Sequence, residues 1–199
     1  MEITQEIISK VIKERRTIYP INFDPNKKIS DINVIKEILD NAIWAPTHKL
    51  TQPWNFKVFF GDGVGTFFKK QQEIYKEITP ADKFAEKKYQ KYDEKAKQVS
   101  AVIAVWMKRD GDNKIPEIEE IVATGCVIEN IYLCLKPYGL AGYLSTGDIC
   151  YTQQIKDFLK IGKNDKCLGF FQLGYPKEGL NLPQRKRIPA EEKTEWIST

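Results

Sequence analysis

The chain opens with apolar residues that recur every three or four positions, which is the spacing of one face of an α-helix. The first such face consists of Ile3, Ile7, Ile8, Val11 and Ile12. This helix should end near Arg15 and Arg16. A second helical pattern follows Ser30, a residue type that often caps a helix N-terminus, and Pro46 should end it.

Short apolar runs further along the chain predict strands. Residues 54–60 alternate well enough for a strand covered mainly on one side, whereas the continuous run 100–107 is typical of a central strand buried on both faces. Two more strands are expected at 140–145 and 167–173. Helical patterns fill the intervals at 66–98, with a break at Thr79 and Pro80, at 116–137 and at 152–159. The Lys- and Glu-rich part from Asp82 to Lys97 is expected to be a solvated excursion.

Length and composition describe one globular domain that spans residues 1–199, because 42% hydrophobic residues suffice for a core at this size. The tail, residues 175–199, has too little periodicity for a core of its own. We expect it to dock as an extended arm on this domain or on a partner chain. No apolar run reaches the roughly 18–20 residues of a membrane span, and the N-terminus is charged, so a soluble, cytoplasmic protein is expected.

Charge and cysteine usage narrow the function classes further. The net charge of +4 is mild and Lys is spread along the chain, so we expect no nucleic-acid partner. The four cysteines, Cys126, Cys134, Cys150 and Cys167, form no C-x-x-C pair. Cys126 and Cys134 lie in an apolar helical pattern, which favours core packing in a reducing compartment over a nucleophilic thiolate.

His48 is the only histidine, which excludes a multi-histidine metal site. It lies with Gln52 in a segment that Pro46 and Pro53 frame and stiffen. Two interpretations stay open: a helix-to-strand connector whose polar groups face water, or a rigid loop that aims those groups at a ligand.

A glycine-rich turn at 61–65 imitates a dinucleotide-binding fingerprint, because it follows a strand and precedes a helix. The third required glycine is replaced by Thr66, and no βαβ unit follows. The stretch is therefore interpreted as a plain strand-to-helix turn. The sequence also contains no Walker loop, no G-x-S-x-G elbow and no zinc-ligand spacing.

Two cationic clusters carry more information about function than the glycine-rich turn. They are Arg15-Arg16-Thr17 and Arg185-Lys186-Arg187. Each alone could be a helix-dipole partner or a solvated charge run. Together they offer guanidinium groups that a fold could bring to one phosphate, for which arginine's planar fork is suited. The glycine-spaced stretch 139–147 would also let backbone N–H groups approach a planar ligand closely.

In their order along the chain, these motifs resemble the FMN-dependent nitroreductase family. They are Arg-Arg-Thr at 15–17, Ala-Pro-x-His-Lys-x-x-Gln-Pro-Trp-x-Phe at 45–56, Gly-Leu-x-Gly-x-x-x-Thr-Gly at 139–147, Leu-Gly-Tyr-Pro at 173–176 and Lys-Arg-x-Pro-x-Glu-Glu-x-x-x-Trp at 186–196. The His-Lys pair points to the small bacterial branch of single-domain members. The resemblance covers about residues 3 to 197.

The resemblance implies an α+β fold with a mainly antiparallel sheet flanked by helices, and an interlocked homodimer with FMN in two interface clefts. Phosphate and flavin contacts would come from Arg15, Arg16, Thr17 and Arg187; ring contacts from Leu144, Ser145 and Thr146; and contacts from the other subunit from His48 and Gln52. Asn130 matches a position interpreted as structural. Close relatives often carry a Trp and a basic residue in place of Leu144 and Ser145, so the substrate side of the pocket should differ.

The resemblance further implies a flavoenzyme that passes reducing equivalents from NAD(P)H to nitroaromatic, quinone or similar acceptors. Since the chain has no separate nucleotide motif, donor and acceptor would use one flavin face in turn, which is ping-pong turnover. No side chain need act as an acid or base, so no catalytic residue is assigned. The alternatives are a specialised dehalogenase- or dehydrogenase-like member and a non-catalytic flavin-binding dimer module.

Overall fold

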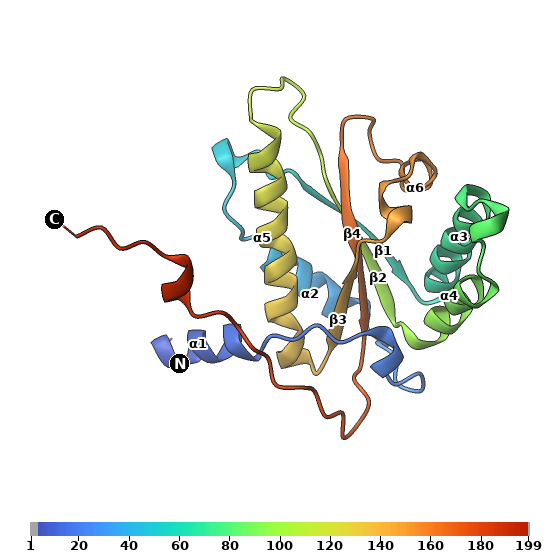
Figure 1. Ribbon diagram of the computed structural model, residues 1–199, viewed down its shortest axis with the longest axis horizontal. Coiled ribbons are helices and arrows are strands. Elements are labelled where there is room, and N and C mark those ends of the chain that lie inside the picture. The colour runs from blue at the N-terminus through green and yellow to red at the C-terminus, as the bar shows by residue number, and fades with distance from the viewer. Residues whose placement is uncertain (1–3, 199) are drawn as a thin grey trace.

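A computed structural model describes residues 4–198, and the expected helix residue Ile3 lies outside them. The described residues form a four-stranded sheet with helices on both faces (Figure 1). The helices are α1 (Gln5–Glu14), α2 (Ile32–Ala42), α3 (Asp62–Ile78), α4 (Glu86–Gln98), α5 (Glu117–Leu135) and α6 (Gln153–Leu159). The strands are β1 (Trp54–Phe60), β2 (Ala101–Met107), β3 (Ala141–Ser145) and β4 (Lys166–Gly174).

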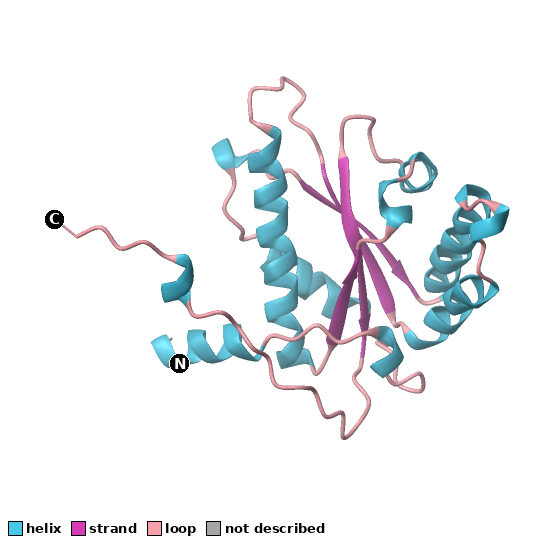
Figure 2. Cartoon of the chain, viewed as in Figure 1, coloured by secondary structure: helices cyan, strands magenta, loops and turns pink. Residues whose placement is uncertain are grey.

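The sheet is antiparallel throughout, in the order β1-β2-β4-β3. Strand β2 lies inside the sheet, and its apolar residues are buried on both faces, so the prediction for 100–107 is confirmed. The α+β class is confirmed as well. Figure 2 shows the sheet between one helical layer that contains α5 and another that contains α3 and α4.

Two hydrophobic clusters hold these layers together, because alternate residues of β2 point to opposite faces. Val102 and Ala104 belong to the cluster with Phe67 of α3 and Phe170. Ile103 and Val105 belong to the second cluster, whose helical residues are Ile35, Ile38, Val127 and Ile131 from α2 and α5. The solvated-excursion prediction for 82–97 is wrong in part, since Tyr92 of α4 is buried against the first cluster.

Two helix starts differ from the expectation. Asp31, not Ser30, caps α2, because its Oδ1 accepts the Asn33 N–H at 2.8 Å. The turn predicted at 61–65 is a single residue: Gly61 has φ +56°, and α3 begins at Asp62. One left-handed glycine turns the chain, so the next two glycines are free to enter the helix.

The predicted break at Thr79 and Pro80 is confirmed, because α3 ends at Ile78 and α4 begins at Glu86. Asn130 is structural as interpreted, since its Nδ2 donates to the Ala42 carbonyl at the end of α2, at 3.1 Å. Cys126 and Cys134 were expected in the core, and this prediction is correct only in part, because both are partly exposed at the rim of the second cluster.

The two ends of the chain run together along one edge of the molecule (Figure 1). Helix α1 has apolar residues but buries none of them, and the tail beyond Pro176 leaves Trp196 78% exposed. None of the helices in residues 4–198 combines the length and hydrophobicity that crossing a lipid bilayer requires.

Candidate functional site

The end of α1 and the C-terminal tail meet, although they are about 170 positions apart in sequence. An Arg185 Nη1 donates to the Arg15 carbonyl, and Arg16 Nη1 donates to the Pro183 carbonyl at 3.1 Å. The two segments border a cavity of about 480 Å³, hereafter the arginine cavity, lined by Ile12, Lys13, Arg15, Arg16, Glu129, Gln184, Arg185 and Arg187. The fold thus brings together three predicted phosphate-site residues.

Positive charge dominates the arginine cavity. Among the described residues its one carboxylate is Glu129, whose Oε1 lies 3.3 Å from the Arg15 Nε. Desolvation and the charges of Arg16, Arg15 and Arg187 lower the pKa of Arg185. Guanidinium groups held this close repel one another, and a bound anion would relieve the repulsion. The cavity therefore fits a phosphate group, and arginine is the residue type that binds phosphate in bidentate fashion.

Arg185 also lines the arginine cavity. The sequence did not predict it as a site residue, although it belongs to the cationic cluster Arg185-Lys186-Arg187. Tyr132 of α5 is a second one. The Tyr132 hydroxyl accepts the Leu144 N–H at 3.0 Å and the Thr17 hydroxyl at 3.4 Å, and Arg15 Cζ lies 5.1 Å from its ring centroid. One side chain thus connects three predicted positions. Tyr132 was not predicted as a site residue, because its position matched the apolar stripe of a long helix.

The predicted ring residues occupy the end of β3. Leu144 packs onto Gly169 of β4, where an added Cβ would stand 2.7 Å from Leu144 Cδ1. Ser145 is half-buried at the strand end, and Thr146 is exposed in the link to the 3₁₀ turn Asp148–Tyr151. Tyr132 connects Leu144 to Arg15, which lines the arginine cavity. A second, more apolar cavity of about 570 Å³ adjoins it, lined by Ile18, Tyr132, Leu135, Leu140 and Leu182 among others.

The loop that carries His48 is conformationally strained. Lys49, Leu50 and Gln52 have φ of 48°, 56° and 46°, the left-handed region that residues other than glycine rarely adopt. Thr47 Oγ1 holds the loop by accepting the Gln52 N–H at 3.1 Å. Strain of this kind is found at functional loops and is uncommon in plain connectors, so it favours the rigid-loop interpretation.

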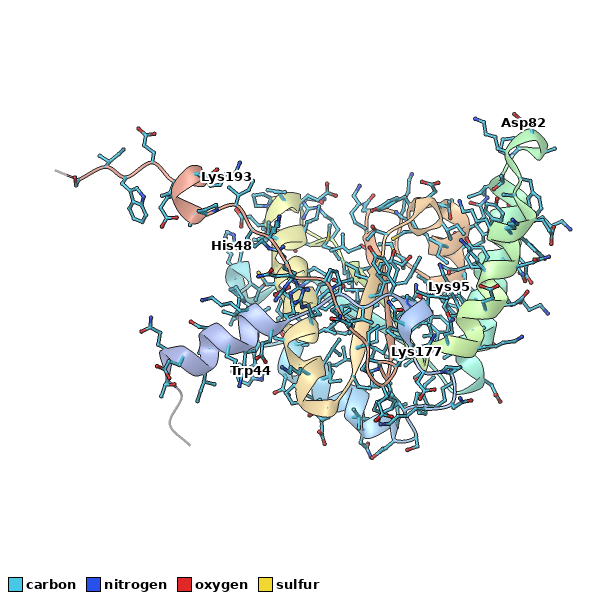
Figure 3. The ribbon with its side chains drawn as sticks, turned by 60° about the horizontal axis from the view of Figure 1, so that its bottom comes forward. Trp44, His48, Asp82, Lys95, Lys177 and Lys193 are labelled. Atoms are coloured by element: carbon cyan, nitrogen blue, oxygen red, sulfur yellow. The ribbon has the colours of Figure 1, made fainter. Side chains whose placement is uncertain are left out.

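His48 and Gln52 do not reach the arginine cavity of their own chain. His48 Nδ1 hydrogen-bonds to Glu119 in the first turn of α5, whereas Arg15 pairs with Glu129 ten residues on. Ten helical residues span about 15 Å. Figure 3 labels His48 beside the first half of α5, and its side chain is 43% exposed. The two predicted halves of the site thus lie apart in one chain.

The chain is an α+β protein whose two ends pair through arginine residues beside a cavity. A sequence model of the nitroreductase family matches residues 12–175, so the chain belongs to the nitroreductase family. The predicted family is therefore confirmed. Among residues 4–198, no group of three or more His, Cys, Asp or Glu side chains is arranged to hold a metal ion.

Relatives of this chain are found by sequence and by structure. "Putative NAD(P)H nitroreductase YfhC" of Bacillus subtilis is 23% identical over 188 residues, covering 94% of this chain and 92% of the relative. A nitroreductase-like family protein from Bacillus cereus superimposes with a TM-score of 0.80 at 25% identity, over 99% of both chains. The FMN-dependent nitroreductase NfnB from Mycobacterium smegmatis, solved with NADPH, gives 0.72 at 16% identity, over 96% and 98%.

Proposed function

We propose that this protein is an FMN-dependent oxidoreductase that uses NAD(P)H to reduce nitroaromatic, quinone or similar acceptors. The observation that carries the proposal is the arginine cavity, built from both ends of a chain that belongs to the nitroreductase family. The printed names of its relatives support the cofactors: YfhC is named for NAD(P)H, and NfnB is FMN-dependent and was solved with NADPH.

The redox chemistry, in which a hydride leaves NAD(P)H and two electrons reach the acceptor, would be supplied by FMN when bound. The residues of this chain would bind and orient it. Arg15, Arg16 and Arg187 would hold the phosphate, and Thr17 would face the flavin together with residues 144–146. Tyr132 would fix these two segments relative to each other. No side chain is assigned a proton-transfer role.

The proposal includes a homodimer in which one domain, residues 1–199, extends an arm from about residue 175 across its partner. Several large apolar side chains are exposed in the single chain: Trp44, which is 86% exposed and labelled in Figure 3, and Leu50, Ile118, Val122 and Trp196. Such a surface is typical of an obligate interface. A second chain could also bring His48 and Gln52 to the arginine cavity. The cytoplasmic location expected from the sequence stays part of this proposal.

The dimer should persist on dilution. Light scattering of the purified protein is expected to give twice the 23.0 kDa chain mass, because obligate interfaces bury about 2,000–5,000 Å². Trp44→Glu would place a charge in the interface and should yield monomers that lose flavin. Glu86→Lys, an exposed change on α4 at the other side of the molecule, is the control. A flavin-bound 23.0 kDa species would contradict the shared site.

The redox function and its ping-pong order can be tested in one anaerobic experiment. The purified protein should be yellow, and NADPH or NADH should bleach it without any acceptor present. After the nucleotide is removed on a desalting column, a nitroaromatic should restore the colour. Colour that no nucleotide bleaches would favour a flavin-binding module instead, and bleached protein that recovers only when nucleotide and acceptor are both present would argue against ping-pong turnover.

A further inference from the structure

Two buried cysteines face each other on the side of the sheet that α3, α4 and α6 cover (Figure 1). The Cys150 thiol donates to the Cys167 Sγ at 3.4 Å, and the two residues are 0% and 5% exposed. Cys150 belongs to the 3₁₀ turn Asp148–Tyr151, and Cys167 lies 17 positions further on, in β4. Both are free thiols, as are the partly exposed Cys126 and Cys134 of α5. The two buried sulfur atoms are therefore in contact without a bond between them.

A β-bulge in β4 brings Cys167 to this side of the sheet. Along a regular strand, residues three positions apart point to opposite faces. Cys167 and Phe170 nevertheless belong to the same hydrophobic cluster. The register with β2 shifts between Cys167 and Gly169 and leaves Leu168 as an extra residue. A bulge of this kind redirects the side chains next to it, so the backbone of β4 aims the Cys167 thiol at Cys150.

The surroundings make Cys167 the more readily ionised of the two thiols. The hydrogen bond from the Cys150 thiol lowers the pKa of Cys167, and the Gly169 backbone N–H and the charge of Lys156 add to this effect against the opposing effect of burial. Lys156 is held near the start of β4, because its Nζ donates to the Asp165 carbonyl at 2.8 Å. The hydrogen bond to Cys167, together with burial, raises the pKa of Cys150. One sulfur can thus react as a thiolate while its neighbour stays protonated.

We propose that Cys150 and Cys167 form a redox site, which a small peroxide oxidises to a disulfide and a dithiol reductant restores. A thiolate with a second thiol in contact is the arrangement that converts peroxide attack into a disulfide. Hydrogen peroxide suits the site because it is hardly larger than water, whereas burial shields the pair from bulky oxidants. In a reducing compartment such disulfides are usually transient and serve catalysis or redox sensing.

The reaction has two steps. The Cys167 thiolate attacks one peroxide oxygen, the O–O bond breaks, and the hydroxide that leaves takes up a proton to become water. The Cys150 sulfur then attacks the Cys167 sulfenic acid, the S–O bond breaks as the S–S bond forms, and the Cys150 proton leaves with the hydroxide as a second water. The two thiols lose two electrons and two protons in all, and peroxide takes up both.

Peptide mass spectrometry of the purified protein tests this site directly. After hydrogen peroxide treatment under native conditions and blocking of the remaining thiols, the peptides that contain Cys150 and Cys167 should be linked, with the loss of two hydrogens. Dithiothreitol should separate them again. Because the bridge would close the segment that contains α6, the melting temperature should rise by about 5–10 °C on oxidation and return on reduction.

Serine variants separate the roles of the two sulfurs. In Cys150→Ser, peroxide should add oxygen to Cys167, because no second thiol is left to displace it. In Cys167→Ser, Cys150 should stay unmodified, because its thiol is protonated. The double change Cys126→Ala with Cys134→Ala is the control and should keep both the bridge and the melting shift. Those two residues are eight positions apart on α5. They are therefore about 12 Å apart, too far to bridge within one chain.

The proposal is overturned if the bridge forms only after the protein is unfolded in urea. It is also overturned if peroxide oxidises Cys126 and Cys134 while Cys150 and Cys167 stay reduced. Formation of the bridge needs no flavin, so the two proposals fail separately. Protein that forms the bridge but binds no FMN would contradict the proposed function alone, and yellow protein that NADPH bleaches but peroxide does not bridge would contradict the redox site alone.

Discussion

Arg187→Ala should weaken FMN binding by about 10- to 100-fold. A charge-assisted, bidentate contact contributes roughly 1.5–3 kcal/mol, and Arg187 is the tail arginine best suited to a clean test. Among residues 4–198 its guanidinium donates only to the adjacent Lys186 carbonyl, at 3.0 Å, which leaves donors available for a phosphate. The measurement is FMN affinity, by fluorescence titration of protein from which the flavin has been removed.

The neighbouring Lys186→Ala is the control, because it removes an equal charge from an exposed residue that does not border the arginine cavity. It should leave FMN affinity within about twofold, since an exposed charge contributes little to binding. Arg15→Ala should also weaken FMN binding, but it additionally breaks contacts to Glu129 and Tyr132. Equal affinities for Arg187→Ala and Lys186→Ala would show that the phosphate site is misplaced.

Arg109→Ala should lower the free energy of unfolding by about 3–5 kcal/mol, because it breaks a buried ion pair. Glu120 is 1% exposed, and its Oε2 accepts from Arg109 Nη1. Its Oε1 accepts the Asp110 N–H at 2.8 Å. Removing the guanidinium would leave a buried carboxylate without its counter-ion. Urea denaturation followed by circular dichroism would measure the change.

The exposed pair Lys114–Asp112, at 2.8 Å, supplies the comparison. Lys114→Ala should cost less than about 1 kcal/mol, because water solvates both charges. Replacing Glu120 by Gln in the Arg109→Ala background should recover part of the loss, since the buried charge is then gone. A loss below about 1 kcal/mol for Arg109→Ala would mean that solvent reaches Glu120.

Local patterns predicted the elements well where the chain has strong periodicity or a proline. Strand β2 and the break at Thr79 follow from such signals, because they depend on neighbours in sequence. The start of α3 did not, since three closely spaced glycines look alike in sequence and only Gly61 needs a left-handed backbone. The burial of Tyr92 depends on α4 folding back onto α3, which a Lys- and Glu-rich composition hides.

The residues of the candidate site could be predicted from the family resemblance, and much less well from the residue patterns alone. Neither arginine run predicts the other, because their contact closes a loop of about 170 residues that only the complete fold defines. Tyr132 could not be predicted as a site residue for a related reason. A hydroxyl on a helix acquires its role from the strand that it faces, and spacing along one helix does not encode that partner.

The left-handed residues of the His48 loop also have a consequence for protein engineering. Each such residue other than glycine stores about 1–3 kcal/mol of strain, and glycine or asparagine adopts this backbone more easily. Directed evolution for heat resistance should therefore return glycine or asparagine at Lys49 and Leu50 early. If those thermostable variants turn over more slowly, the strained loop supports activity at the cost of thermal stability.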